Sequence, residues 1–180
     1  MPEKTGIYIC KPLTMDNWKD LEDLFGPHGA DGGCWCMFFR LVYKDFHENR
    51  GLRNKELFKE VVGRGQPVGL LAYYDDKAVG WIAIAPRNEY PRLDRSRNYK
   101  AIDAVPVWSI TCFYTDRDYR RKGVTRFLIE NAIRIAGENG VGVVEAYPVD
   151  PRGKVQDATA YTGLLQVFLD IGFSEVARRS

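Results

Sequence analysis

Four basic side chains and no acidic one surround a glycine between residues 120 and 126, which read Arg-Arg-Lys-Gly-Val-Thr-Arg. Cations at a helix N-terminus oppose the helix dipole, each by roughly 0.3 to 1 kcal/mol, so a turn that only connects a strand to a helix should avoid them. A bound anion reverses this sign, because the N–H groups of a first helical turn point at phosphate oxygens. The segment therefore predicts a phosphate-binding turn, with a solvated basic turn as the alternative.

The other residues of this turn suit the same purpose. Gly123 lets the backbone approach a ligand closely, and Thr125 is a residue type that favours a helix start. Two common phosphate motifs do not explain the cations. The chain has no G-x-x-x-x-G-K-[ST], and Gly137, Gly140 and Gly142 follow the predicted helix where a dinucleotide fingerprint would open one.

Residues 108–125 read Trp-Ser-Ile-Thr-Cys-Phe-Tyr-Thr-Asp-Arg-Asp-Tyr-Arg-Arg-Lys-Gly-Val-Thr, which resembles motif A of the GNAT superfamily of acyl-CoA-dependent N-acetyltransferases. The family signature is Gln or Arg, two residues, Gly, one residue, then Gly or Ala. Arg120 and Gly123 match it, whereas Thr125 stands where the family has Gly or Ala. The ending Leu-Asp-Ile-Gly-Phe at 169–173 also resembles that of the family.

The resemblance implies that acetyl-CoA is the acyl donor and that no metal is needed. The coenzyme's pyrophosphate would lie on the amides of residues 121–126, and its pantetheine arm would take main-chain hydrogen bonds beside the preceding strand, a form of β-augmentation. The coenzyme-binding residues implied in this way are Phe113, Tyr114, Thr115, Arg120, Arg121, Lys122, Gly123, Val124, Thr125 and Arg126.

The resemblance also points to a catalytic acid, which this sequence lacks at the usual position. Many members have a Tyr there that protonates the departing thiolate, and the corresponding residue here is Phe168. Tyr161, at the start of the same predicted helix, is a candidate either to replace this acid or to contact the coenzyme, with a core or capping tyrosine as the alternative.

Carboxylates near the predicted parallel strands are candidates for a general base. Glu145 leads because it lies inside an otherwise apolar predicted strand, where burial could raise its pKa. Asp150 and Asp103 are the others. The alternative for each is a solvated or ion-paired carboxylate.

Residues 33–40, Gly-Cys-Trp-Cys-Met-Phe-Phe-Arg, are the second unusual segment. The family architecture places this loop on the acceptor side, so we expect Trp35, Phe38 and Arg40 to bind substrate. Ordinary core aromatics beneath a loop are the alternative.

The same segment supplies two thiols. Cys34 and Cys36 with His28 and His47 offer zinc ligands, but the Cys-x-Cys spacing and the wide gaps fit structural zinc sites poorly. A redox pair of these two thiols is disfavoured in a reducing compartment. We expect no metal.

The 21-residue connection 86–106 is a second candidate wall of the acceptor site, with a solvated mobile loop as the alternative. Its five cations would favour an acidic acceptor. They are Arg87, Arg92, Arg95, Arg97 and Lys100.

These residues must be positioned by strands and helices that the apolar periodicity predicts. Residues 107–114, 125–138 and 141–147 form a strand, a helix and a strand, and hence a right-handed parallel βαβ unit. The strands 68–74 and 78–85 form an antiparallel hairpin that leads into it. Further elements are expected at 6–10 (strand), 14–25, 52–62 and 161–171 (helices), and 173–177 (strand). The fold class is α/β, a single GNAT-like domain over residues 1–180 with a mixed sheet and helices on both faces.

Composition excludes several partners. The chain has 180 residues, 45% of them hydrophobic, and 26 Lys and Arg against 24 Asp and Glu. This balance predicts no nucleic acid and no anionic membrane as partner. The longest stretch without charge, 104–115, is shorter than the roughly 20 residues of a membrane helix, and the charged opening is not that of a signal peptide. We therefore expect a cytoplasmic protein, with a homodimer left open.

Together these observations predict an enzyme that transfers an acetyl or short acyl group from acetyl-CoA to a primary amine of a small molecule or peptide. The alternative is a non-catalytic CoA-binding regulatory domain, which the missing acid at Phe168 makes credible.

Overall fold

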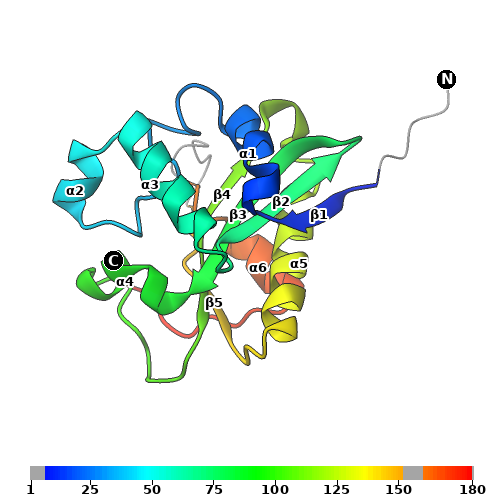
Figure 1. Cartoon of the computed structure of the whole chain (residues 1–180). Helices are drawn as coiled ribbons and strands as arrows, with labels where there is room; N and C mark the ends of the chain where they lie inside the picture. Colours follow the sequence, from blue (N-terminus) through cyan, green and yellow to red (C-terminus); the bar gives the residue numbers. More distant parts are fainter. Residues whose placement is uncertain (1–6, 152–159, 180) are drawn as a thin grey trace.

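The computed structural model describes residues 7–151 and 160–179 (Figure 1). Within them, five strands form one sheet in the order β1-β2-β3-β4-β5. The strands are β1 (Ile9–Pro12), β2 (Gly69–Tyr74), β3 (Lys77–Pro86), β4 (Trp108–Thr115) and β5 (Val144–Ala146). The α-helices are α1 (Trp18–Phe25), α2 (Tyr43–Glu48), α3 (Leu52–Gly63), α4 (Pro91–Arg95), α5 (Val124–Glu138) and α6 (Leu165–Ile171).

The sheet is mixed, as predicted. The first four strands pair antiparallel in chain order, and β4 pairs with β5 in parallel. The β2–β3 hairpin turns through Asp75 and Asp76, at φ 46° and 64°. Two central residues with positive φ are the hallmark of a two-residue turn whose twist matches that of the strands.

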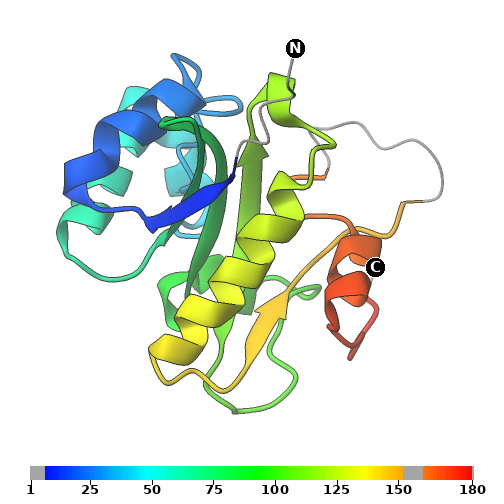
Figure 2. The same cartoon turned by 90° about the vertical axis from the view of Figure 1, so that its right-hand side faces the viewer.

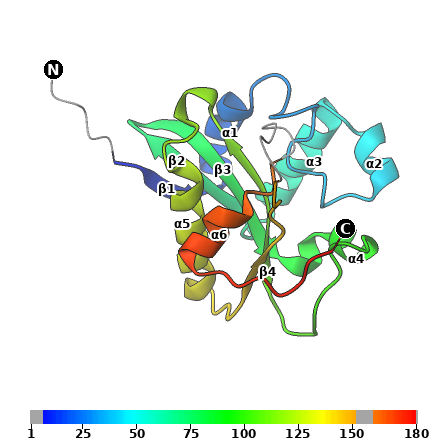
Figure 3. The same cartoon turned by 180° about the vertical axis from the view of Figure 1, so that it is seen from behind.

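Helices cover both faces of the sheet, which explains why β3 is apolar almost throughout. Figure 3 shows α5 and α6 on the near face and α1 and α3 behind the sheet. Alternate residues of β3 point into two hydrophobic cores, one on each face of the sheet. Trp81 packs with the buried residues of α1 and α3, and Ile82 packs with those of α5. Both side chains have no exposed surface.

Two predicted strands are shorter than expected or absent. Residues 173–177 form no strand, because Gly172 ends α6 in the left-handed conformation and turns Phe173 back against Phe168, leaving the rest exposed. Strand 141–147 is reduced to β5, and the helix expected from residue 161 begins at Leu165.

The connection 86–106 is more ordered than the expected loop. It contains a 3₁₀ turn (Arg87–Glu89) and the short helix α4, and it buries Tyr90 and Leu93 completely. Helix α2 was not predicted, because its six residues are too few for a clear helical period.

The N-terminus of α5 lies unusually close to the sheet because β3 has a glycine beneath it. A Cβ atom built on Gly80 would lie 2.4 Å from Cγ1 of Val124, the first residue of α5 and itself only 2% exposed. Gly80 therefore sets how closely the basic turn approaches β3.

We predict that Gly80→Ala lowers the free energy of unfolding by about 1 to 3 kcal/mol, because α5 must shift to admit the methyl group. Chemical denaturation measures the change. Gly137→Ala, in the exposed last turn of the same helix with open space around it, is the matched control and should stabilise the protein by about 0.5 to 1 kcal/mol. Equal effects of the two substitutions would contradict the close approach.

Candidate functional site

The parallel pair β4–β5 is short because β4 carries a bulge. Pairing with β5 extends only over residues 108–110 of β4. On the other side of β4, Ile110 pairs with Ile84 and Cys112 with Ala83, so Thr111 is an extra residue. A bulge bends its strand and disrupts the ladder locally. In Figure 2 the chain after β5 accordingly runs away from β4.

The separated part of β4 is the predicted pantetheine edge, residues 113–115. The Phe113 amide points outward and donates a hydrogen bond of 2.7 Å to the carbonyl of Tyr161. The carbonyl of Thr115 accepts from Nε of Arg120 at 3.3 Å. Both main-chain groups thus face away from β3, as the β-augmentation hypothesis requires, and each already has a partner.

The predicted phosphate turn leads from this edge into α5. Arg121 and Gly123 adopt positive φ, 59° and 81°, and Gly123 is the N-cap residue. Gly123 has no side chain to cap the helix, and the first bond of this end runs from the Phe127 amide to the Gly123 carbonyl. Within the described ranges, the amides of residues 121–126 donate to no backbone acceptor. The helix therefore begins with a set of donors at its positive end.

The four cations of the turn differ in what they contact. Arg121 and Lys122 are exposed, and Nζ of Lys122 lies 5.3 Å from the centre of the Tyr119 ring. Arg126 points down the helix and pairs with Glu130 at 2.9 Å. An exposed i, i+4 pair contributes only about 0.3 to 0.5 kcal/mol, so Arg126 can reorient at little cost.

A partly buried ion-pair network holds the β4–β5 junction together. Nη1 of Arg87, whose side chain is 12% exposed, donates to Oε1 of Glu145 and to the Tyr147 hydroxyl, both at 2.6 Å. Its Nη2 reaches Asp94 at 2.8 Å. The Ser109 hydroxyl donates to the same Glu145 oxygen at 2.8 Å. Arg87, the first cation of the connection 86–106, is thus linked to β5 through Glu145 and, through the same carboxylate oxygen, to Ser109 of β4.

This network changes the view of Glu145 and includes Tyr147, which was not among the predicted site residues. Glu145, the leading base candidate, has one oxygen that accepts from Arg87, Ser109 and Tyr147. Burial and the hydrogen bond to Glu145 raise the pKa of the Tyr147 hydroxyl. Residues 145 and 147 share one face of their strand, which was the signal for this cluster in the sequence. Arg87, however, is 58 residues away from Glu145.

Phe168, at the usual position of the catalytic tyrosine, and Tyr161, the candidate to replace it, have different environments. Phe168 is 1% exposed and packs edge-on against Phe113 and Phe173, so it is a core residue. Tyr161 is half-buried beside Phe38, and burial raises the pKa of its hydroxyl to about 12. The Tyr161 side chain therefore keeps its proton at neutral pH.

The expected acceptor residues differ in how deeply they are buried. Trp35 is 4% exposed and packs between Trp18 and Phe25, so it belongs to the core and the acceptor assignment does not suit it. Phe38 is half-buried, with the guanidinium of Arg92 3.8 Å from its ring centre. Two cations of the connection, Arg87 and Arg92, are thus committed to internal contacts, which weakens the case for an acidic acceptor.

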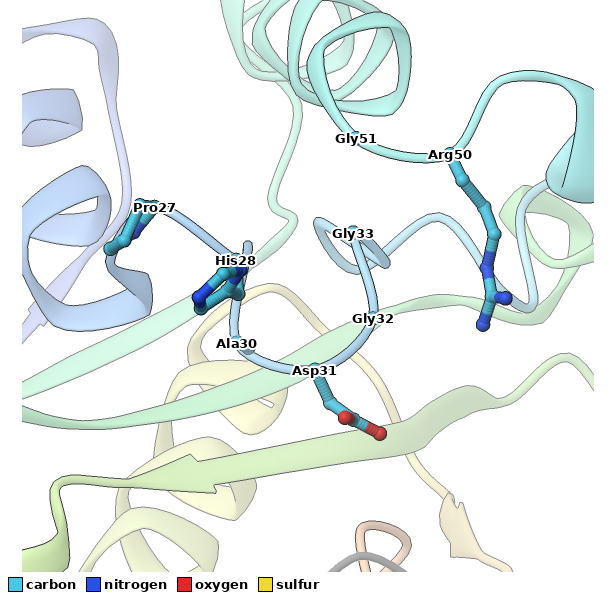
Figure 4. A pocket seen from close by; sticks show the side chains of 8 residues that line it. All are labelled: Pro27, His28, Ala30, Asp31, Gly32, Gly33, Arg50 and Gly51. Atoms are coloured by element: carbon cyan, nitrogen blue, oxygen red, sulfur yellow. The ribbon is translucent and has the colours of Figure 1, made fainter.

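A surface hollow of about 550 Å³ lies in the loop after α1 (Figure 4). Figure 4 shows His28 and Asp31 on one segment and Arg50 on the facing one. The hollow contains none of the residues predicted to bind acceptor or coenzyme. Its lining residues are Pro27, His28, Ala30, Asp31, Gly32, Gly33, Arg50 and Gly51.

The proposed zinc ligands do not converge. Across residues 7–151 and 160–179 no group of three or more His, Cys, Asp or Glu side chains could hold a metal ion. His47, for example, packs at a tilt against Tyr43, with 4.2 Å between ring centres. Over the same ranges, no helix is both long and apolar enough to traverse a bilayer.

The start of α5 with its donor amides lies next to a parallel pair that separates at a bulge, which is the geometry that the phosphate-binding and β-augmentation hypotheses require. The model of the acetyltransferase (GNAT) family matches residues 35–155, which is more than half of the chain. The protein therefore belongs to the GNAT acetyltransferase family, and the resemblance seen in the sequence is confirmed.

Solved structures share the fold over nearly the whole chain. The aminoglycoside N-acetyltransferase AAC(6')-Iy in complex with CoA has a TM-score of 0.59 at 15% identity, covering 100% of this chain and 96% of that one. The aminoglycoside 6'-N-acetyltransferase AAC(6')-IG from Acinetobacter haemolyticus scores 0.53 at 17% identity, covering 96% and 94%. A ribosomal-protein-alanine N-acetyltransferase from Brucella melitensis biovar Abortus 2308 scores 0.53 at 13% identity, covering 97% and 96%. No curated protein sequence matches the chain.

We predict that Arg87→Gln lowers the free energy of unfolding by about 2 kcal/mol, because it leaves a half-buried Glu145 without its cation. Thermal and urea denaturation measure the loss. Arg134→Gln breaks an exposed pair with Glu138 and should cost about 0.5 kcal/mol or less. If both variants unfold alike, the Arg87 network does not stabilise the β4–β5 junction.

Proposed function

We propose that this protein transfers an acetyl or other short acyl group from acetyl-CoA to a primary amine of a small molecule or peptide. One observation carries the proposal: the uncapped, cation-flanked start of α5 adjoins a strand edge that has parted from its parallel neighbour. Membership of the GNAT family and the CoA complex of a structural relative support it.

In this proposal the coenzyme's pyrophosphate binds the amides of residues 121–126, with Arg121 and Lys122 supplying charge. The pantetheine arm extends along residues 113–115. Its amide carbonyl replaces the Tyr161 carbonyl as acceptor for the Phe113 amide, so binding exchanges one hydrogen bond for another. The thioester then lies near the bulge at Thr111.

Transfer requires an attacking neutral amine, a donor for the tetrahedral oxyanion and a proton for the departing thiolate. A main-chain amide of residues 112–114 is the oxyanion donor in this proposal. Tyr161 gives its proton to the CoA thiolate, since it lies beside the parted edge and is protonated at neutral pH. We assign Glu145 a positioning role, because its Oε1 already accepts three hydrogen bonds.

The acceptor belongs on the side of Phe38 and the hollow in the loop after α1. The relatives act on quite different amines, an aminoglycoside in one case and an alanine of a ribosomal protein in another. Exposed Asp31 in the hollow attracts cationic amines, whereas Arg50 attracts carboxylates. A panel should therefore include aminoglycosides, polyamines and peptides with free N-termini.

We predict that Arg121→Glu with Lys122→Glu weakens CoA binding by about thirtyfold, equivalent to about 2 kcal/mol, because two favourable charges become repulsive. The remaining affinity should also depend less on salt concentration. Calorimetry at two salt concentrations measures both effects.

The matched control is Lys59→Glu with Arg64→Glu, which makes the same change in net charge on an exposed residue of α3 and on the exposed residue that follows it, on the opposite face of the sheet. This variant should bind CoA like the native chain. Unchanged affinity of the Arg121 and Lys122 variant, or equal losses in both variants, would place the pyrophosphate elsewhere.

We predict that Tyr161→Phe lowers kcat about tenfold or more and leaves KM for acetyl-CoA within about twofold, as expected for loss of a proton donor alone. Acetyl-CoA consumption with the amine panel provides the assay. Tyr99→Phe, a half-buried neighbour on the connection, is the control. Tight CoA binding without turnover of any amine would instead favour the regulatory domain that buried Phe168 suggested.

A further inference from the structure

Tyr8, which lies just before β1, contacts the basic turn at the start of α5. Its hydroxyl donates a hydrogen bond of 3.2 Å to the carbonyl of Lys122, 114 residues further along the chain. Within residues 7–151 and 160–179, that carbonyl accepts no backbone hydrogen bond. A side chain from the far edge of the sheet therefore holds the backbone of the turn.

Other aromatic side chains fix the Tyr8 ring and so give its hydroxyl a defined position. The ring centre lies 5.6 Å from that of Tyr74, at the end of β2, and 5.6 Å from that of Phe127 on α5. Tyr74 in turn contacts Tyr119, 5.4 Å away in the 3₁₀ turn before α5. Aromatic pairs at such distances attract each other beyond the effect of the area that they bury. The four rings thus join the first two strands to both sides of the basic turn.

The backbone of the turn needs such a support. Arg121 has φ 59° and Gly123 has φ 81°, so the peptide group between Lys122 and Gly123 lies between two left-handed residues. A left-handed arginine costs free energy and persists only where its surroundings enforce the conformation. Tyr8 supplies one such constraint, because it fixes the carbonyl of the residue directly after Arg121.

The same hydrogen bond sets the direction of a donor. The described chain has no cis peptide bond, and in a trans peptide group the C=O and the N–H point in opposite directions. A Lys122 carbonyl that points at Tyr8 therefore leaves the Gly123 N–H pointing away from Tyr8. Among the described residues this N–H donates to no backbone acceptor, so it is available to a ligand.

We propose that Tyr8 is a positioning residue for the coenzyme, which aims the Gly123 N–H at the pyrophosphate through the Lys122 carbonyl. The inference rests on the proposed function, since it takes CoA as the ligand of the basic turn. A donor that is oriented before the ligand arrives needs no reordering when the anion binds. Tyr8 lies on the carbonyl side of the peptide group, so it acts without touching the phosphate.

Tyr8→Phe tests the proposal, because it removes the hydroxyl and keeps the ring between Tyr74 and Phe127. We expect the dissociation constant of CoA to rise about fivefold, as when one hydrogen bond to a ligand is weakened. KM for acetyl-CoA should rise similarly and kcat should stay within about twofold, since the chemical step is unchanged. Calorimetry measures the first effect, and acetyl-CoA consumption measures the second.

Tyr73→Phe is the matched control. It also removes a tyrosine hydroxyl, one that donates to Asp20 at 2.7 Å, but its ring packs in the core under α1 and α3. This variant should bind CoA like the native chain, and urea denaturation compares the stability that the two variants lose. Equal losses of CoA affinity in both variants would mean that Tyr8 only stabilises the fold, which contradicts the proposal.

The sequence allows the peptide group itself to be observed. Lys122 and Gly123 form the only Lys-Gly pair in the chain, so labelling lysine carbonyls with ¹³C and glycine amides with ¹⁵N gives one correlated NMR signal. Without ligand, Tyr8→Phe should shift the carbonyl carbon of this signal, because the carbonyl loses its donor. Added CoA should shift the Gly123 amide of the native chain, and it should shift that of Tyr8→Phe less.

The outcomes separate this inference from the proposed function. If CoA shifts the signal of the native chain and Tyr8→Phe behaves identically, the positioning role alone is wrong. If the native signal does not respond to CoA, both this role and the placement of the pyrophosphate on the turn are wrong. The expected loss of CoA affinity and the smaller shift support the role even where no amine is acetylated, since both are measured without turnover.

Discussion

The site depends on one constraint, that β4 and β5 stay paired for three residues and then separate. Parallel pairing is slightly less stable per residue than antiparallel pairing. A ladder of three residues therefore contributes little stability by itself. The Arg87 network compensates, because a single guanidinium bridges Glu145, Tyr147 and Asp94 at the paired end. The bulge at Thr111 acts at the other end and bends β4 away. The pairing of β4 with β5 and their separation are therefore set by different residues, so one can change without the other.

The same strand pair positions the basic turn. The turn must carry the chain from β4 to α5 within eight residues, and it does so through a 3₁₀ turn (Arg117–Tyr119) and two left-handed residues. Gly80 then allows Val124 to sit directly on β3. As a result the donor amides at the start of α5 lie next to the separated edge of β4. The proposed binding of one extended ligand requires this arrangement.

Local features of the sequence were sufficient to predict some elements and not others. The hairpin, α5 and the basic turn follow from turn residues, helical period and charge within short windows, and they were predicted correctly. The strand at 173–177 was wrong because apolar residues alone do not supply a pairing partner. Trp35 and Phe38 could not be told apart, since the left-handed residues Trp35 and Cys36 change the faces that ordinary alternation would assign. The Arg87–Glu145 pair joins residues too distant for any local pattern.

The sheet separates two kinds of chemistry. On the edge near α5, exposed cations and main-chain donors suit a phosphorylated ligand that comes and goes. On the α1 and α3 face, the Arg40 side chain is buried, where its charge needs a counter-charge built into the fold, and Glu89 provides one at 3.2 Å. Cys112 belongs to both regions, because its backbone forms the bent strand and its side chain packs against the core under α1 and α3. The packing of this core and the geometry of the bulge are therefore linked through one residue of β4.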